Sequence, residues 1–437
     1  MTEKQRRRSL IALMALTFLV LVVYMYVKYD SQDTIRIGIY TGSSWDVPGT
    51  DQYALFDKAI EKFQTRYPNI KVVYEEGISV DDYSEWLAHE ILNGQEPDIY
   101  LILPDDFSTL VGIRALKNLN GTILKDMSFD KDVFYESTYT AGERNGIQYA
   151  LPFTCNPRMM FVNISLMNEA GVDMPAEDWS WKDFLKLCRR MTKDTDGDGI
   201  LDQFGYYDYS WQDAAYANRA EPFDEDGTES YFTSEAMMEA LSFTKELQEV
   251  NQGQRVTSDD FDLGHVAYRP MTFAEYRTYM PYPWRIKKYS TFDWNATSMP
   301  AGDQGENIST MNTLLLGMSS RTNNPEMAWE FMKMMTTDSE IQTAIYEYTA
   351  GASPVKDVTR SDEVAVLLNE DTPGDVDIDM SLLDRIIEDA VVPKEFANYD
   401  TVFQYADHYI KEALEEDEEM NISMSGLNKE LRQLLNR

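Results

Sequence analysis

The feature that most constrains the fold is a regular alternation of strand and helix patterns that begins at Thr34. Residues 34–40 alternate apolar and polar side chains with a period of two, which predicts a strand. Apolar residues at helical spacing then predict a helix from Leu55 onward, ended by Tyr67-Pro68. The alternation continues with a strand at 70–74, a helix at 83–92 and a strand at 97–103. Strands that alternate with helices predict a parallel sheet covered on both faces, and so an α/β fold.

The loops that follow these strands are the first candidates for a binding site. In open α/β sheets, ligands bind beyond the carboxyl ends of the strands. Those ends are occupied here by Thr41–Thr50 and by Pro104–Phe107. The same alternation of strand and helix patterns recurs later in the chain. Met159–Val162 predicts a strand, and Ser180 predicts the N-cap of a further helix. With 437 residues, the chain is long enough for more than one such α/β unit.

The composition excludes several classes of function. The chain has 39 Lys and Arg against 75 Asp and Glu, a formal charge of −36 that repels phosphate backbones and argues against nucleic-acid partners. Its 2 Cys and 3 His give little support for a Cys/His zinc site. We find no G-x-S-x-G elbow, phosphate loop or H-E-x-x-H motif. We therefore predict no catalytic residues and interpret the chain as a binding protein rather than an enzyme.

The N-terminus predicts membrane attachment. Residues 1–9 form a basic flank, and an apolar run over Leu10–Val27 follows it. At 1.5 Å per residue this run nearly crosses a bilayer core, and the basic flank should stay in the cytoplasm. A cleaved signal peptide is the alternative, but Tyr24–Tyr29 offers no small residues for a cleavage site. We therefore predict a signal anchor at residues 10–28, a single-pass protein of the cell membrane, and an extracytoplasmic domain after it.

Several motifs in a fixed order resemble one protein family. After the opening strand and its loop come the helix LFDKAIEKFQTRYPNIKV and the segment GQEPDIYLI. The next are YALPFTCNPRMMFVN, WSWKDFLKLCRRM and FDLGHVAYRP. The last are NNPEMAWEFMKMMTTDSEIQ and Gly351-Ala352-Ser353-Pro354. Together they resemble the extracytoplasmic solute-binding proteins of ABC importers, specifically the group that includes maltose- and oligosaccharide-binding proteins. The resemblance spans the chain from about Thr34 to its C-terminus.

The resemblance implies a two-lobed, periplasmic-binding-protein-like fold with a hinge and a sugar in the cleft. It assigns residues 34–153 and 297–338 to lobe 1, and residues 154–296 and 339–437 to lobe 2. The implied function is that of the substrate-binding subunit, which binds a carbohydrate, expected to be an oligosaccharide, and delivers it to the ABC permease subunits. The chain departs from the Gram-positive members in lacking a lipobox cysteine near its N-terminus. Because of that departure, two functions stay open: the binding subunit of a transporter, and a tethered sugar-sensing module for a sensor kinase.

Sugar recognition requires flat apolar faces and planar hydrogen-bonding groups, and both occur in the expected cleft loops. The candidates on lobe 1 are Trp45, Asp46, Asp105, Asp106 and Asn312. The candidates on the opposite face are Asn156, Trp211, Tyr276, Trp284 and Tyr348. Trp181 and Trp329 fit apolar helix faces and are assigned to the core. A surface glycosidase is a third interpretation, but with so many acids a catalytic carboxylate pair cannot be argued from spacing.

The sharpest local motif is an aspartate-rich loop. Alternate aspartates followed by glycine match the opening of a calcium-binding loop, although its twelfth position is Gly205 rather than a bidentate Glu. The predicted ligands are the Asp194, Asp196, Asp198 and Asp202 side chains and the Ile200 carbonyl. A run of Asx turns that binds no metal is the alternative. No cofactor is required, and Ca²⁺ is the one candidate. The sequence leaves open whether Cys155 and Cys188 form a disulfide.

Overall fold

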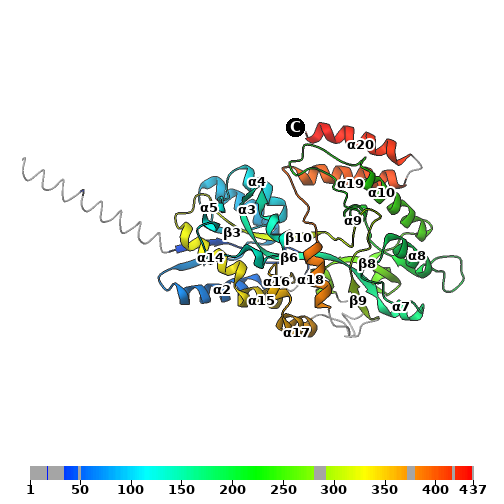
Figure 1. Ribbon diagram of the computed structural model, residues 1–437, viewed down its shortest axis with the longest axis horizontal. Helices are drawn as coiled ribbons and strands as arrows, with labels where there is room; N and C mark the ends of the chain where they lie inside the picture. The colour runs from blue at the N-terminus through cyan, green and yellow to red at the C-terminus, as the bar shows by residue number, and fades with distance from the viewer. Residues whose placement is uncertain are drawn as a thin grey trace, which may run out of the picture.

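The chain forms two α/β lobes around one continuous sheet (Figure 1). The computed structural model describes residues 34–47, 51–279, 292–371, 379–415 and 419–435, together with residue 17. Within these residues, a sheet of eight strands has the order β2-β1-β3-β10-β6-β8-β7, with β9 paired to β6. The predicted α/β class is therefore confirmed.

Lobe 1 contains the first three strands and the helices that cover them. Its strands are β1 (Thr34–Gly38), β2 (Lys71–Tyr74), β3 (Ile99–Ile102), β4 (Glu143–Arg144), β5 (Ile147–Gln148) and β10 (Met311–Met318). Its helices are α2 (Gln52–Arg66), α3 (Val80–Asn93), α4 (Phe107–Gly112), α5 (Asn120–Ile123), α6 (Glu136–Ala141), α14 (Pro325–Thr337) and α15 (Ser339–Tyr348). Short 3-10 turns are η1 (Pro104–Asp106) and η2 (Lys131–Val133).

Lobe 2 is built on the other end of the sheet. Its strands are β7 (Phe204–Tyr206), β8 (Val266–Thr272) and β9 (Trp294–Thr297). Its helices are α7 (Ile164–Glu169), α8 (Trp181–Met191), α9 (Trp211–Ala217), α10 (Glu235–Gln248), α11 (Ser258–Asp262), α12 (Phe273–Thr278), α19 (Tyr399–Glu415) and α20 (Met420–Leu435), with the 3-10 turn η3 (Glu249–Asn251). Three further helices lie near the junction of the lobes: α16 (Lys356–Thr359), α17 (Asp362–Asp371) and α18 (Met380–Asp389).

Strand β6 (Ala150–Asn163) joins the two lobes. Its first half pairs with β10 between Ala150 and Pro157, and its second half pairs with β8 and β9 from Arg158 onward. The three first-lobe strands pair in parallel, as predicted. β10 and β6 run antiparallel to each other, so the whole sheet is mixed. The parallel prediction fails at these two strands because they carry the chain back and forth between lobes.

The local predictions for lobe 1 agree closely with the structure. Strands β1, β2 and β3 and helices α2 and α3 lie where the alternation placed them. Gly94 ends α3 in the left-handed region, with φ of 69°, which suits a residue without a Cβ. In lobe 2, the Ser180 hydroxyl accepts from the Asp183 N–H and the Asp183 carboxylate accepts from the Ser180 N–H, so α8 begins with a full capping box.

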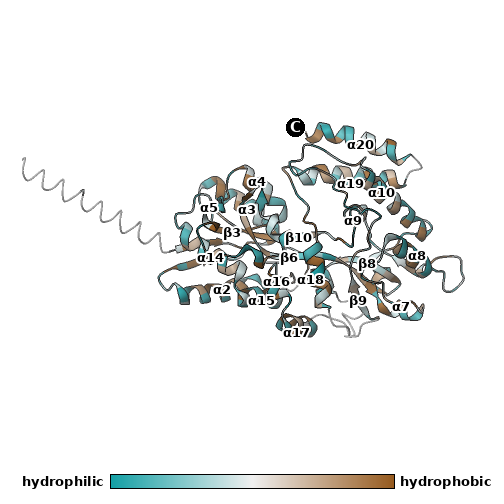
Figure 2. Cartoon of the chain, viewed as in Figure 1, coloured by the Kyte–Doolittle hydropathy of each residue, from teal (hydrophilic) through white to brown (hydrophobic). Residues whose placement is uncertain are grey.

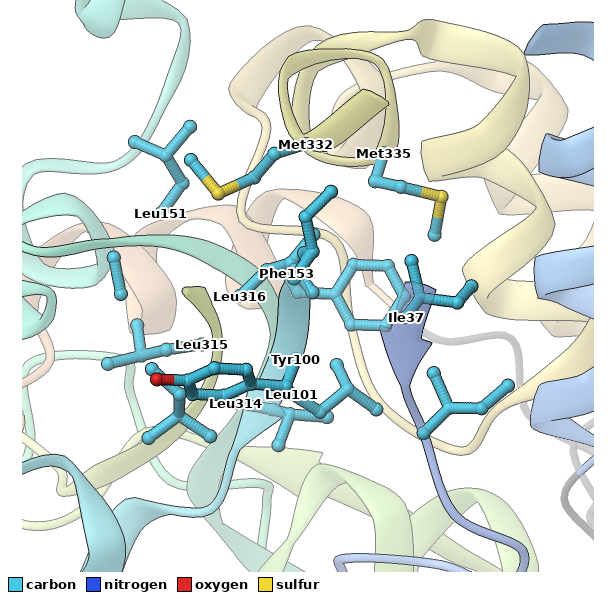
Figure 3. Packing of buried hydrophobic residues seen from close by; sticks show 14 of the residues in the cluster. Ile37, Tyr100, Leu101, Leu151, Phe153, Leu314, Leu315, Leu316, Met332 and Met335 are labelled. Carbon is cyan, nitrogen blue, oxygen red and sulfur yellow. The ribbon is translucent and has the colours of Figure 1, made fainter. Parts of the chain in front are cut away.

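The first-lobe core is packed around β1, β3, β6 and β10. Ile37, Leu101, Phe153, Leu316 and Met332 meet there from five different elements (Figure 3). Apolar residues line the strands, whereas the outward faces of the surrounding helices are polar (Figure 2). The same core includes Ile341, Ala344 and Ile345 of α15. Helix α15 therefore packs with lobe 1, beyond the predicted boundary at residue 338.

Among the described residues, no helix combines the length and the apolar character that a membrane span requires. The predicted anchor at Leu10–Val27 lies outside the described residues, except for Thr17.

Candidate functional site: a cavity between the lobes

A cavity of about 530 Å³ lies between the lobes. Lobe 1 contributes Pro104 and Phe107 from the end of β3, together with Arg144. Asn312 and Thr313 of β10 also line the cavity. The cavity thus lies beyond the carboxyl end of a parallel strand, where the α/β rule places ligands.

Aromatic side chains of lobe 2 form the opposite wall. They are Tyr216, Phe223, Tyr231 and Tyr399. Tyr216 lies near the end of α9, and its hydroxyl bonds to that of Tyr399 at the start of α19. The Phe223 ring packs on Phe396 with centroids 5.4 Å apart. Phe223 also packs on Tyr399, with ring centroids 6.0 Å apart, so Tyr216, Phe223 and Tyr399 hold one another in place.

Residues 390–398, here called the crossing segment, close one side of the cavity. The segment is fixed to the hinge by hydrogen bonds between Val391 and the backbone of Ser309 and Met311. It is fixed to lobe 1 because the Ser108 hydroxyl and, at 3.2 Å, the Arg144 guanidinium donate to the Glu395 carbonyl. The segment then enters α19 of lobe 2. The crossing segment therefore contacts both lobes, and its conformation depends on the distance between them.

An ion pair between strand β6 and helix α9 holds the part of lobe 2 that carries Tyr216. Arg158 of β6 donates to the Asp213 carboxylate of α9, with Nε 2.6 Å from Oδ1. The Asp213 side chain is 4 % exposed. The same carboxylate accepts from the Ser210 N–H at 2.9 Å, which completes a capping box at the start of α9. Asp213 thus sets the direction of the helix that carries Tyr216.

Of the predicted lobe 1 residues, Asn312 lines the cavity and is exposed. Asp105 is exposed beside Pro104, and its carboxyl lies against that of Glu395. Asp106 is half-buried and accepts a 2.6 Å hydrogen bond from Ser84. Burial raises the pKa of Asp106, and that hydrogen bond opposes the rise. These three residues therefore lie at or near the cavity.

Trp45, Asp46 and Tyr348 do not line this cavity. Trp45 lies in a loop, as predicted, but its side chain is only 8 % exposed and packs in the core of lobe 1. Asp46 is exposed, with φ of 54°. Tyr348 is half-buried at the end of α15. The structure therefore separates these three from the group around Asn312.

Three of the candidates predicted for the opposite face, Asn156, Trp211 and Tyr276, are buried. Asn156 accepts from the Ala274 N–H at 2.9 Å, and Tyr276 is 1 % exposed. Trp211 begins α9 and donates from Nε1 to Asp407 at 2.9 Å, so it packs in the core rather than standing free in a loop. Trp284 lies outside the described residues.

The aspartate-rich loop folds around Asp194. Its carboxylate accepts from Gly197 at 2.6 Å and from Gly199 at 2.8 Å, and these hydrogen bonds lower the pKa of Asp194. Carboxylate oxygens of Asp194, Asp196 and Asp202 lie within 4.8 Å of one another. Asp198 instead accepts from the Ile200 N–H. The loop gathers three of the four predicted carboxylates, an arrangement that suits a hard cation.

Both cysteines are buried and free. Burial raises the pKa of both thiols, which makes each a packed apolar group rather than a reactive nucleophile.

The sequence reasoning missed all four residues of the aromatic wall. Tyr216 and Tyr231 come from neighbouring segments and Tyr399 from a much later one, and none of them lies in a recognisable motif. The one signal in the sequence is an excess of tyrosine, 27 against 19 phenylalanines, which gives no positions.

Two lobes joined by crossing strands, with an aromatic cavity between them, define a two-lobed binding protein. A family model for bacterial extracellular solute-binding proteins matches residues 58–369. The chain belongs to this family, and its folded lobes are extracytoplasmic.

Solved structures share the fold at low sequence identity. The cyclic alpha-maltosyl-1,6-maltose binding protein from Arthrobacter globiformis has a TM-score of 0.74 and 14 % identity, covering 92 % of this chain and 98 % of that chain. The sugar-binding protein MalE from Xanthomonas citri has a TM-score of 0.73 and 13 % identity, covering 92 % and 97 %. An ABC substrate-binding protein from Listeria monocytogenes in complex with cycloalternan has a TM-score of 0.67 and 19 % identity, covering 92 % and 99 %.

Proposed function

We propose that this chain is the carbohydrate-binding subunit of an ABC importer. It would hold an oligosaccharide in the cavity between the lobes and present it to the permease subunits. The observation that carries the proposal is the cavity itself, in which aromatic faces of lobe 2 oppose polar groups of lobe 1. Aromatic faces stack on the C–H faces of sugar rings, and amide and carboxylate oxygens accept from hydroxyls. Among the proteins of similar fold, one binds cycloalternan and another binds maltotetraose.

The architecture supports a closure mechanism for delivery. β6 and β10 cross between the lobes, and the crossing segment touches both of them. A ligand that contacts both walls gains more contacts when the lobes approach, so binding favours the closed form. A permease that recognises surfaces of both lobes would then distinguish loaded from empty protein.

The test compares two tyrosines of equal exposure. Tyr231 lines the cavity and Tyr405 lies on α19 outside it, and each is 38 % exposed. We expect Tyr231→Ala to weaken oligosaccharide binding by about 1–3 kcal/mol, by analogy with other stacking platforms. Tyr405→Ala should leave the affinity unchanged. Isothermal titration calorimetry on the purified full-length chain measures both, and equal affinities of the two variants would contradict the cavity assignment.

We further propose that residues 10–28 form an uncleaved signal anchor that keeps the binding protein in the cell membrane. The apolar run Leu10–Val27 and the absence of a cleavage site after it support this proposal. Expressed in a Gram-positive host, the chain should fractionate with membranes at full length. Mass spectrometry of a secreted form that lacks the first thirty or so residues would contradict the anchor.

We also propose that the Asp194–Asp202 loop binds calcium. Millimolar calcium should raise the melting temperature of chelator-treated protein, because a ligand that binds only the folded state stabilises it. Affinity in the weak extracellular range of about 10⁻⁴–10⁻³ M is expected. Asp196→Ala should remove most of the gain, whereas Asp226→Ala, outside the loop, should not. A melting temperature that ignores calcium would favour the Asx-turn alternative.

A further inference from the structure

Arg144 of strand β4 lines the cavity and contacts three separate parts of the molecule. Its Nη2 atom donates to the Ser108 hydroxyl and to the Glu395 carbonyl, each at 3.2 Å. Its Nη1 atom lies 3.7 Å from Oε1 of Glu225, in the loop between α9 and α10 of lobe 2. The Arg144 side chain is 14 % exposed, so salt screens these contacts less than it screens a pair on the outer surface. One guanidinium therefore joins lobe 1, the crossing segment and lobe 2.

The loop that carries Glu225 has a fixed shape and packs on the crossing segment. The Asp224 carboxylate accepts from two backbone N–H groups of the same loop, each at 2.7 Å. Gly227 has φ of 65°, and a Cβ there would lie 2.3 Å from the Phe396 ring. Lys394 of the crossing segment lies 3.1 Å from Oε2 of Glu225. The loop and the crossing segment therefore form one unit, and the other Glu225 oxygen pairs with lobe 1.

Charge around the cavity makes this contact between the lobes important. The two cations that line the cavity are Arg144 and Lys394. The carboxylates that line it belong to Glu143, Glu221, Asp224, Glu225 and Glu395. Because like charges repel, the walls resist approach more strongly when the Arg144 charge is absent. Separation of the lobes also lengthens the distance from Arg144 to Glu225, since β4 belongs to lobe 1 and the loop to lobe 2.

We propose that Arg144 is a clasp between the lobes, which restrains their opening through the Glu225 carboxylate and the Glu395 carbonyl. The inference rests on the proposed binding function, because it concerns how the same cavity opens and closes. Arg144 is thus a positioning residue that keeps the two walls close before a ligand arrives. Loss of the clasp favours the open form, in which a ligand contacts fewer groups and is released more readily.

Single-molecule energy transfer between the lobes tests the clasp without any ligand. Dyes on Leu92→Cys in lobe 1 and Ile422→Cys in lobe 2 measure the separation, because both side chains are exposed whereas the native cysteines are buried. Glu225→Gln removes the negative charge and keeps the shape. In the full-length chain in mild detergent, it should raise the open-to-closed ratio about two- to fivefold, the range for a partly exposed ion pair. Added salt should open the wild type more than this variant.

A double-substitution cycle locates the effect in the clasp. Arg144→Gln should open the lobes at least as much as Glu225→Gln, because it also weakens the contact with the Glu395 carbonyl. The double variant should open them no further than Arg144→Gln, since the second change then has no partner to remove. Glu246→Gln is the matched control. It breaks an ion pair with Arg189 of 2.8 Å that lies within lobe 2, and should leave the lobe separation unchanged.

The outcomes separate this inference from the proposed function. An unchanged lobe separation in both single variants would overturn the clasp, and so would additive effects in the double variant. These measurements use the ligand-free chain, so they do not depend on which solute binds. Failure of every oligosaccharide to bring the two dyes closer in the wild type would instead count against the proposed carbohydrate-binding function.

Discussion

Asp213→Ala is expected to lower the free energy of unfolding by about 3–5 kcal/mol, the usual cost of leaving a buried charge without its partner. The substitution leaves the Arg158 guanidinium facing a gap, since Arg158 Nε lies 2.6 Å from the lost carboxylate. It also removes the reciprocal hydrogen bond of the capping box at the start of α9. Chemical unfolding of the purified chain, followed by tryptophan fluorescence, measures the loss.

The chain offers a matched control for this prediction. Asp183 completes the same kind of capping box with Ser180 at the start of α8, but the cations that act on it, Lys182 and Lys186, are exposed. Asp183→Ala should therefore cost only about 1 kcal/mol, the value of a cap. If the two substitutions cost the same, the Arg158–Asp213 pair contributes nothing beyond capping, and our account of how α9 is held in place is wrong.

The second large effect is expected at Trp45. Trp45→Ala should cost about 3–5 kcal/mol of stability, because the indole packs in the core of lobe 1 and its removal leaves a cavity. Its Nε1 also faces Gly351, where an added Cβ would lie 2.9 Å away. Trp86, which is half-buried and stacks on Tyr83, is the control and should cost less. The folded fraction of Trp45→Ala should lose less sugar affinity than Tyr231→Ala. Normal stability with abolished binding would instead place Trp45 in the ligand site.

The secondary structure of lobe 1 could be predicted because its signals are local. Alternation with a period of two, helical spacing and end signals such as Tyr67-Pro68 and Gly94 all act within a few residues. The ordered family motifs predicted that the chain has two lobes. The packing of α15 with lobe 1, beyond the predicted boundary at residue 338, was not predicted. Helix α15 packs against α2 of lobe 1, a contact between residues nearly three hundred positions apart that no local pattern encodes.

The site was harder to predict because burial and aromatic contacts are tertiary properties. Trp211 follows a serine in a polar stretch, which favoured a loop, yet the Ser210 and Asp213 capping box begins a helix there. Asn312 was chosen because the resemblance implies a sugar-facing turn at Met311-Asn312-Thr313, whereas the structure has these residues at the start of strand β10. Tyr216 and Tyr399 were not found, because their pairing requires α9 and α19 to be docked already.

The central claim is that this two-lobed protein binds a carbohydrate, and a thermal-shift panel tests it most directly. The full-length chain would be melted with neutral, amino and acidic oligosaccharides, and with amino acids and short peptides as other solute classes. A ligand at a hundred times its dissociation constant stabilises the folded state by about 2.7 kcal/mol. Our account predicts that at least one oligosaccharide raises the melting temperature and that Tyr231→Ala reduces the shift. Stabilisation by a peptide or amino acid, with no response to any sugar, would contradict it.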